Sequence, residues 1–284
     1  MKVELAKSAG FCYGVRRAVE VAQQTVASGR PCVMLGHIIH NNSVIESLEA
    51  QGVAVVDRPE DVPEGSAVII RSHGEGRAVH EALEARGVEI IDTTCPNVSR
   101  IHRLVSEAEA EGRTPLIIGA PSHPEIQAIA GWCREPVVLD GPEALEEWLK
   151  EDRARAQMPL AMVSQTTSTR ERWETCIKKV KKECTNIKIS DTICNATCKR
   201  QAEAQELAAR NEAMIVIGSR ESSNTRRLAE LCAALCPTVL WIERAEELEP
   251  SNLYGKASVG ITAGASTPGW IIKEVYDKMS DEIM

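Results

Sequence analysis

Three widely separated cysteines are the residues of this sequence best suited to carry chemistry. Cys12, Cys95 and Cys194 each stand where a predicted strand gives way to a predicted helix, and they are spaced near one domain length apart. Thiolates suit zinc and iron–sulfur clusters. A structural zinc site normally closes with a fourth ligand, often at a short local spacing, whereas three dispersed cysteines fit a cluster with one iron open to substrate. The spacing therefore favours direct chemistry at an open iron, and a Cys₃ zinc site is the alternative.

Two of these cysteines end matching tetrapeptides. Asp92–Cys95 reads Asp-Thr-Thr-Cys and Asp191–Cys194 reads Asp-Thr-Ile-Cys, each directly after a predicted strand. The echo suggests three related units, each giving one thiolate to a shared centre. Cys198 follows one helical turn later, but Gln201 stands where a radical-type Cys-x-x-x-Cys-x-x-Cys motif needs its third cysteine. The other cysteines lie in apolar or helical stretches and are expected to be packing residues: Cys32, Cys133, Cys176, Cys184, Cys232 and Cys236.

Polar side chains collect after the predicted strands. In open parallel sheets, ligands bind beyond the carboxyl ends of the strands, where loops lead into helices. Backbone N–H groups at helix N-termini favour an anion, and Ser, Thr or Asn side chains add donors, so this inventory fits a diphosphate. Histidine recurs at three of these junctions and can donate two hydrogen bonds when protonated. The segments are His40–Asn42, Ser72–Glu75, Ser122–Glu125, Ser164–Thr167, Ser222–Asn224 and Ala265–Pro268.

The elements that must position these residues alternate along the chain. Short runs rich in Val and Ile are followed by longer amphipathic stretches, which predicts buried parallel strands joined by crossover helices. The predicted strands are Val53–Val56, Ala67–Ile70, Val88–Ile91, Pro115–Ile118, Val137–Leu139, Leu160–Val163, Asn186–Ser190, Met214–Ile217, Val239–Ile242 and Val259–Thr262. The expected domain limits are 1–95, 96–193 and 194–284, with the N-terminal strand a candidate to pair with the last unit.

Composition excludes several classes of protein. With 43% hydrophobic and 26% charged residues, the 284-residue chain is neither disordered nor collagen-like. A net charge of −8 disfavours a nucleic-acid or anionic-membrane binder, although a local anion site is still compatible with it. Walker A and Gly-x-Gly-x-x-Gly patterns are absent, and no apolar run approaches the roughly 20 residues of a membrane span. We therefore expect a cytoplasmic protein with reduced cysteines, no membrane contact and no nucleic-acid partner.

Taken in order, the motifs of nearly the whole chain resemble the 4-hydroxy-3-methylbut-2-enyl diphosphate reductase family, iron–sulfur enzymes that end the non-mevalonate isoprenoid pathway. Each string is short, but nine of them in the family's order are highly specific. The resemblance is carried by Gly10–Cys12, His40-Asn41, Ser72–Gly74, Asp92–Pro96, His123–Glu125, Gln165–Thr167, Cys194, Gly218-Ser219 with Ser222–Asn224, and Ala263–Ser266.

The resemblance implies a fold, a cofactor and a site. It implies three related α/β units with mostly parallel sheets, arranged pseudo-threefold around a central [4Fe-4S] cluster. Cys12, Cys95 and Cys194 would hold this cluster and leave one iron open. Thr166 would hydrogen-bond near the substrate hydroxyl, and Glu125 would belong to the proton relay. The implied diphosphate pocket consists of His40, His73, His123, Ser222, Ser223, Asn224 and Ser266.

The implied reaction is a reductive dehydroxylation. The allylic diphosphate would lose its hydroxyl as water and give isopentenyl and dimethylallyl diphosphate, with ferredoxin or flavodoxin as electron donor. Two other classes stay open from the residues alone. A hydro-lyase that uses an open iron as Lewis acid would need no external electrons. A redox- or metal-sensing binding protein would be marked by a basic recognition helix, and the sequence has no such basic patch.

Overall fold

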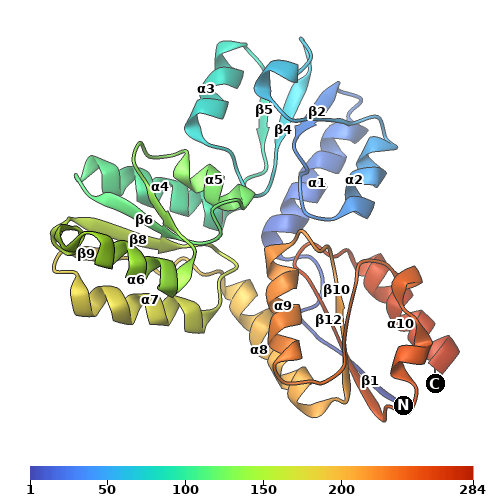
Figure 1. Ribbon diagram of the computed structural model, residues 1–284. Coiled ribbons are helices and arrows are strands. Elements are labelled where there is room, and N and C mark those ends of the chain that lie inside the picture. The colour runs from blue at the N-terminus through green and yellow to red at the C-terminus, as the bar shows by residue number, and fades with distance from the viewer. Residues whose placement is uncertain (284) are drawn as a thin grey trace. The chain divides into compact units, whose positions relative to one another are not determined.

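The structure, a computed structural model, describes residues 1–283 and contains three four-stranded sheets in which every strand pair is parallel (Figure 1). The predicted α/β class with parallel sheets is confirmed. The strands are β1 (Lys2–Leu5), β2 (Cys32–Leu35), β3 (Ala54–Val56), β4 (Ala67–Ile70), β5 (Ile90–Asp92), β6 (Thr114–Ile118), β7 (Val137–Leu139), β8 (Leu160–Ser164), β9 (Ile187–Ile189), β10 (Ala213–Ile217), β11 (Val239–Ile242) and β12 (Ser258–Ala263). The α-helices are α1 (Tyr13–Ala27), α2 (Asn42–Glu49), α3 (Arg77–Ala85), α4 (Pro96–Ala110), α5 (Pro124–Ala130), α6 (Gly141–Glu151), α7 (Arg170–Glu183), α8 (Asn195–Arg210), α9 (Ser223–Ala233) and α10 (Gly269–Ile283).

The three sheets share one strand order. Sheet B has the spatial order β3-β2-β4-β5 and sheet C has the order β7-β6-β8-β9. If the strands of each sheet are numbered along the chain, both orders read 2-1-3-4. Sheet A runs β11-β10-β12-β1, so the N-terminal strand takes the fourth place. In every sheet the first and third strands are therefore neighbours, and we call them the central pair. The chain leaves them toward opposite edges, which makes each central pair a topological switch point.

Sheet A is covered by helices on both faces. The side chains of a strand point alternately to the two faces, so successive residues are buried on opposite sides of the sheet. Ala213, Ile215 and Ile217 of β10 pack in one core with Ile271 and Val275 of α10. Met214 and Val216, on the opposite face of the same strand, pack with residues of α8 and α9 that include Leu207, Leu228 and Cys232. A strand covered on both faces needs an uninterrupted apolar run, which is why Ala213–Ile217 reads as one.

Sheets B and C follow the same rule with shorter edge strands. All four residues of β2, all four of β4 and all five of β8 are buried. The edge strands β5 and β9 have three residues each and are only partly buried. The central strands therefore form the cores, and the fourth strands lie at the margins, where each continues toward a cysteine.

Several strands differ from the sequence prediction. The predicted strands do not include Cys32–Leu35 (β2), and Cys32 lies in a strand as well as in the core. β5 begins at Ile90 instead of Val88. Gly87, at φ +67°, ends the turn after α3, and the Val88 N–H bonds the Leu83 carbonyl at 3.1 Å. Val88 therefore completes a helix C-terminus and does not begin the strand.

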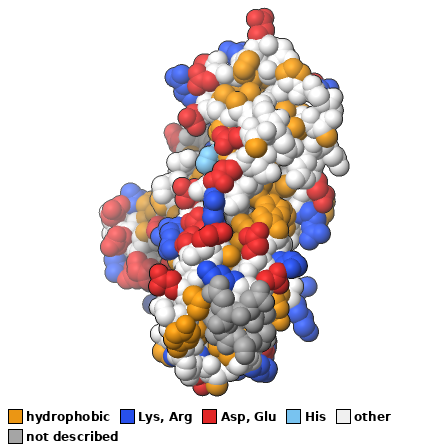
Figure 2. Space-filling view, turned by 90° about the vertical axis from the view of Figure 1, so that its right-hand side faces the viewer, with side chains coloured by type: hydrophobic (Ala, Val, Ile, Leu, Met, Phe, Trp, Pro, Cys, Tyr) orange, Lys and Arg blue, Asp and Glu red, His pale blue; other side chains and the backbone are white. Residues whose placement is uncertain are grey.

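The chain divides into two compact units. One consists of residues 1–16, 39–47 and the chain from Asn195 onward, with sheet A at its centre, and the other consists of residues 17–38 and 48–194, with sheets B and C. The three-part division at residues 95 and 193 stays a prediction. Within the described part of the chain, no helix is both long and apolar enough to span a bilayer. On the face shown in Figure 2, acidic side chains are interspersed with basic ones.

Candidate active site

The predicted site residues follow the central pairs of the three sheets. The loop after each first or third strand carries at least one of them, as expected for parallel sheets, in which ligands bind beyond the strand carboxyl ends at the switch point. His40 follows β2 and His73 follows β4; His123 and Glu125 follow β6 and Thr166 follows β8; Ser222, Ser223 and Asn224 follow β10 and Ser266 follows β12. The three candidate cluster cysteines instead follow the fourth strands, β1, β5 and β9.

Glu125 and Thr166 form a buried pair beyond the central strands of sheet C. Thr166 donates its backbone N–H to Glu125 Oε1 at 2.7 Å and its hydroxyl to Oε2 at 2.6 Å. The Glu125 side chain is in the interior, with the residue 3% exposed. This burial raises the pKa of Glu125, and the two hydrogen bonds from Thr166 oppose that rise. The Glu125 carboxyl group is therefore easier to protonate than a carboxyl group in water.

The start of α5 positions Glu125. His123 is the N-cap residue of this helix, and its ring Nδ1 accepts the Glu125 backbone N–H at 3.1 Å. Pro124 occupies the first helical turn, where its missing N–H costs nothing. Because Nδ1 is an acceptor, a neutral His123 ring carries its proton on Nε2. The ring of His73 lies 5.5 Å from that of His123, edge to face.

A buried histidine that sequence reasoning did not select supports the loop of His73. His102 of α4 stacks on Trp132, with ring centroids 5.2 Å apart and an interplanar angle of 18°. Burial lowers the pKa of His102 to about 4, so this ring is neutral near pH 7. Trp132 donates its indole N–H to the Glu75 carbonyl at 2.9 Å. No local sequence signal marks this support, since it joins residues far apart in the chain.

Gly74 lies directly against this histidine. It has φ +76°, and a Cβ there would lie 2.6 Å from His102 Cε1 and 3.0 Å from Thr94 Cγ2. Only glycine fits, because a side chain meets both a strained backbone and a buried ring. The position of His73 therefore depends on glycine at the next position, residue 74.

We expect Gly74→Ala to lower the free energy of unfolding more than Gly87→Ala, by a further ~1–3 kcal/mol. Both positions have positive φ, but nothing lies within 4 Å of a Cβ at Gly87, so that variant reports the backbone cost alone. Urea unfolding of both variants measures the difference. Equal losses would contradict the tight packing of Gly74 on His102.

The loops after the central pair of sheet A form a second group. The Ser222 hydroxyl caps α9 by accepting the Thr225 backbone N–H at 3.3 Å. The Ser266 hydroxyl donates to the His40 carbonyl at 2.9 Å, and His40 Nδ1 lies 3.8 Å from Glu221 Oε2. The loops that carry His40, Ser222 and Ser266 are thus neighbours within one compact unit, as expected of residues with a common ligand.

Asn224 is the most informative residue of this group. It is 3% exposed, and neither its amide nitrogen nor its amide oxygen has a hydrogen-bond partner among the described residues. A buried amide without partners costs free energy, so it is expected to serve a ligand. It lies in the first turn of α9, where the helix dipole favours a negative charge.

The three candidate cluster cysteines share one setting. Each is partly exposed, lies outside any disulfide and directly precedes a helix: Cys12 precedes α1, Cys95 precedes α4 and Cys194 precedes α8. Cys12 Sγ accepts the Val15 N–H at 3.5 Å, and Cys194 Sγ accepts the side-chain amide of Asn97 at 3.3 Å. Asn97 follows Cys95 by two residues, so the segments of Cys95 and Cys194 lie side by side.

The cysteines predicted to pack in the interior differ from these three. Burial raises the pKa of Cys133 and Cys176 to about 11 and that of Cys232 to about 12, which keeps these thiols protonated. Burial also raises the pKa of Cys32 and Cys184. A protonated, apolar thiol is neither a nucleophile nor a metal ligand. These buried thiols are therefore poorly suited to bind a metal.

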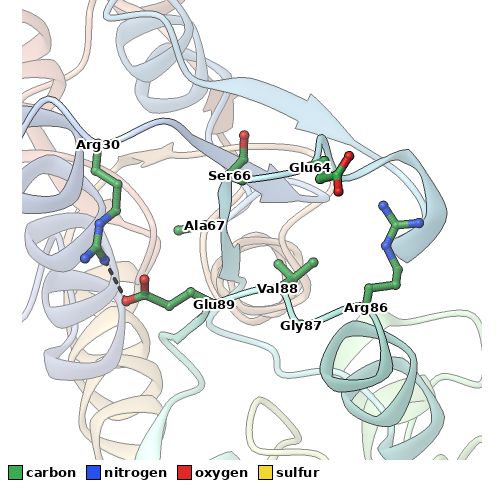
Figure 3. A pocket seen from close by; sticks show the side chains of 9 residues that line it. Arg30, Glu64, Ser66, Ala67, Arg86, Gly87, Val88 and Glu89 are labelled. Atoms are coloured by element: carbon green, nitrogen blue, oxygen red, sulfur yellow. Dashed lines mark hydrogen bonds and ion pairs between the residues drawn. The ribbon is translucent and has the colours of Figure 1, made fainter.

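A pocket at the amino ends of the sheet B strands, opposite the carboxyl ends that carry the predicted site residues, does not belong to this site. It has a volume of about 460 Å³ and lies at the amino ends of β4 and β5 (Figure 3). Arg30 pairs with Glu89 across it at 2.6 Å, and Arg86 donates to the Val62 carbonyl at 2.7 Å. Both arginines are therefore engaged, and none of the predicted site residues lines this pocket.

The raised pKa of Glu125 predicts a pH dependence of stability. A carboxyl whose pKa is higher in the folded than in the unfolded protein binds more protons when folded, so stability falls as pH rises between the two values. We expect Glu125→Gln, which mimics the protonated acid, to gain stability relative to wild type by about 1.4 kcal/mol per pH unit over that window. Urea unfolding across a pH series of both proteins measures this gain, and parallel pH profiles would contradict it.

Known proteins share both this sequence and this fold. A family profile described as LytB protein matches residues 3–280. The chain is 39% identical to the 4-hydroxy-3-methylbut-2-enyl diphosphate reductase of Caldanaerobacter subterraneus subsp. tengcongensis, over 98% of this chain and 96% of the relative. It is 40% identical to the protein of the same name from Geobacter sulfurreducens, over 99% of this chain and 98% of the relative.

Two solved structures resemble it along nearly its whole length. The first is described as (E)-4-hydroxy-3-methyl-but-2-enyl diphosphate reductase, the terminal enzyme of the non-mevalonate pathway. It has a TM-score of 0.71 at 36% identity and covers 99% of this chain and 100% of its own. The second, the E-1-hydroxy-2-methyl-but-2-enyl-4-diphosphate reductase from Plasmodium falciparum, has a TM-score of 0.92. At 24% identity, with 99% of this chain and 89% of its own covered, this second likeness shows the fold alone.

Proposed function

The chain belongs to the LytB family, and we propose that it reduces 4-hydroxy-3-methylbut-2-enyl diphosphate to isopentenyl and dimethylallyl diphosphate. One observation carries this proposal: Thr166 joins a buried acid to a candidate metal ligand. Its N–H and hydroxyl hold Glu125, and its carbonyl accepts the Cys194 backbone N–H at 3.0 Å. A proton source and a thiolate are thus fixed by the same residue.

The LytB family implies an iron–sulfur cluster, and three residues of this chain suit it. We assign Cys12, Cys95 and Cys194 as ligands of a [4Fe-4S] cluster with one iron open. The donor chemistry fits, because all three are partly exposed thiols outside disulfides at helix starts, while several of the other thiols are kept protonated by burial. When bound, the cluster would supply electrons and polarise the substrate hydroxyl through its open iron.

Glu125 and Thr166 would handle the leaving hydroxyl. Breaking the allylic C–O bond consumes two electrons and two protons, with one proton leaving as part of water and one added to the carbon skeleton. Burial favours the protonated form of Glu125, so this carboxyl can hold the proton that turns hydroxide into water. The Thr166 hydroxyl, 2.6 Å from Glu125 Oε2, is placed to pass or orient that proton. Because both side chains are buried, water from solvent competes little with the substrate.

The diphosphate would be held by neutral donors. Asn224 offers a buried amide, Ser222 and Ser223 lie at the start of α9, and Ser266 lies on the neighbouring loop. Hydrogen bonds to a charged group contribute roughly 1.5–3 kcal/mol each. His40, His73 and His123 are assigned to the same ligand as donors, and His123 would use Nε2 because its Nδ1 is engaged. We further propose ferredoxin or flavodoxin as the electron donor.

We expect Asn224→Ala to weaken binding of the substrate, and of inorganic pyrophosphate as its probe, by about tenfold or more. The same change removes an unpaired buried amide, so the free energy of unfolding stays the same or rises. Asn211→Ala is the matched control: Asn211 is also buried, but its amide donates to the Leu207 carbonyl at 3.0 Å, so this variant loses stability. Calorimetric titration and urea unfolding measure both effects. Unchanged affinity, or a large loss of stability on Asn224→Ala, would remove Asn224 from the pocket.

The whole proposal is tested by anaerobic purification, iron and sulfide analysis, and turnover with and without a reductant. We expect Glu125→Gln to lower turnover by about 10²-fold or more while iron, sulfide and visible absorbance match wild type, since it removes a proton donor and no ligand. Protein without iron and sulfide, or turnover without reductant, would contradict a reductase. Wild-type turnover of the Gln variant would contradict the role of Glu125 alone.

A further inference from the structure

We propose that a basic hollow beside Cys95 is the docking surface for an acidic electron-carrier protein; this inference rests on the proposed function. The hollow has a volume of about 410 Å³. Three arginines line it: Arg17 of α1, and Arg100 and Arg103 of α4. All three belong to the unit that contains sheets B and C. In a chain with a net charge of −8, such a local excess of positive charge calls for a specific partner.

The positive charge of the hollow is largely uncompensated. Arg17 donates to the backbone carbonyls of Thr94 and Asp92 at 3.4 Å, and Arg100 donates to the Asp191 carbonyl at 3.4 Å. Among the described residues, neither arginine forms an ion pair with a carboxylate. Arg103 has an exposed partner one helical turn away, Glu107, at 3.6 Å. Such an exposed i,i+4 pair is weak and leaves Arg103 accessible to a stronger partner.

The single carboxylate that lines the hollow is engaged elsewhere. Asp92 Oδ1 accepts both the backbone N–H of Thr94 at 2.8 Å and its hydroxyl at 2.5 Å. The N-terminus of α4, which begins at Pro96 on the wall of the hollow, adds a positive partial charge. The rest of the chain's negative charge is screened beyond about 8 Å at physiological ionic strength. An acidic protein surface therefore meets a locally positive one.

The location of the hollow points to an electron carrier as the occupant. Thr94 and Pro96 both line it, and Cys95, a proposed cluster ligand, lies between them and is partly exposed. The reaction needs two electrons, so a one-electron carrier must bind and leave twice per turnover. Transient redox encounters use small interfaces whose on-rates depend on complementary charge. Arg100 and Arg103 on the exposed face of α4 suit such a contact.

The test measures binding of an acidic bacterial flavodoxin, FMN-loaded and oxidised, to the anaerobically purified holoenzyme. We expect the double variant Arg100→Gln/Arg103→Gln to bind about tenfold more weakly than wild type at about 50 mM salt. The difference should vanish near 0.5 M salt, where the Debye length falls to about 4 Å and charges are strongly screened. Arg17 is left unchanged because it donates to two backbone carbonyls, on either side of Thr93, whereas Arg100 donates to one and Arg103 to none among the described residues.

Two further variants sharpen the result. Arg134→Gln/Arg153→Gln removes the same charge from exposed arginines outside the hollow and should bind flavodoxin as wild type does. Arg100→Lys/Arg103→Lys keeps the charge and should bind nearly as tightly as wild type. Equal weakening in the control pair, no weakening in the test pair, or wild-type binding that does not change with salt would each overturn the docking surface. Displacement of flavodoxin by millimolar pyrophosphate at constant ionic strength would identify a small-anion site and overturn it too.

Turnover with dithionite separates this inference from the proposed function. Arg100→Gln/Arg103→Gln should turn over at the wild-type rate with this small reductant, while its turnover with reduced flavodoxin falls about tenfold at low salt. A dithionite rate that falls as far as the flavodoxin rate would overturn the docking surface, because the arginines would then act on the site itself. Failure of the wild-type protein to turn over with dithionite would contradict the proposed function instead.

Discussion

Parallel pairing of the first and third strands in each sheet is the constraint on which the rest of the structure depends. Because β6 and β8 are hydrogen-bonded neighbours in register from Thr114 to Ile118, the loops that follow them emerge side by side. Glu125 and Thr166 are 41 residues apart in sequence but in direct contact for this reason. The same pairing of β10 with β12 places the Ser266 loop near the start of α9. A single topological rule, applied three times, thus supplies all the polar loops.

The fourth strands have a different task. They lie at the sheet margins, are short, and each leads within a few residues to a cysteine ahead of a helix. The Cys95 backbone N–H bonds the Ser72 carbonyl, the Cys194 N–H bonds the Thr166 carbonyl and the Cys12 N–H bonds the Ala265 carbonyl. In every case the acceptor lies on a loop that follows the third strand of the same sheet. The three candidate cluster cysteines and the candidate substrate loops are therefore built on adjacent strands and coupled through main-chain hydrogen bonds.

Much of this arrangement could be predicted from the sequence, because it depends on local patterns. Val- and Ile-rich runs identified most strands, and the polar residues predicted to follow them do lie on the loops after the strands. β2, with the sequence Cys-Val-Met-Leu, was not predicted as a strand because only its valine is typical of strands. The support of the His73 loop by His102 and Trp132 could not be found, since it arises from packing between distant segments. The unpaired amide of Asn224 likewise exists only in the tertiary structure, because in sequence it resembles an ordinary helix start.

The place of β1 in sheet A has a consequence for how the protein is made. Lys2 pairs with Ser258, so β1 must wait for a strand made roughly 250 residues later before it can be hydrogen-bonded. At roughly 5–20 residues per second, that delay is on the order of 10–50 seconds. Such distant pairings also form slowly once the chain is free. The backbone N–H of Cys12 bonds the Ala265 carbonyl, so Cys12 is fixed in place only after that distant segment has been made. Any ligand that needs Cys12 held in this position can then bind only after the segment around Ala265 has been synthesised.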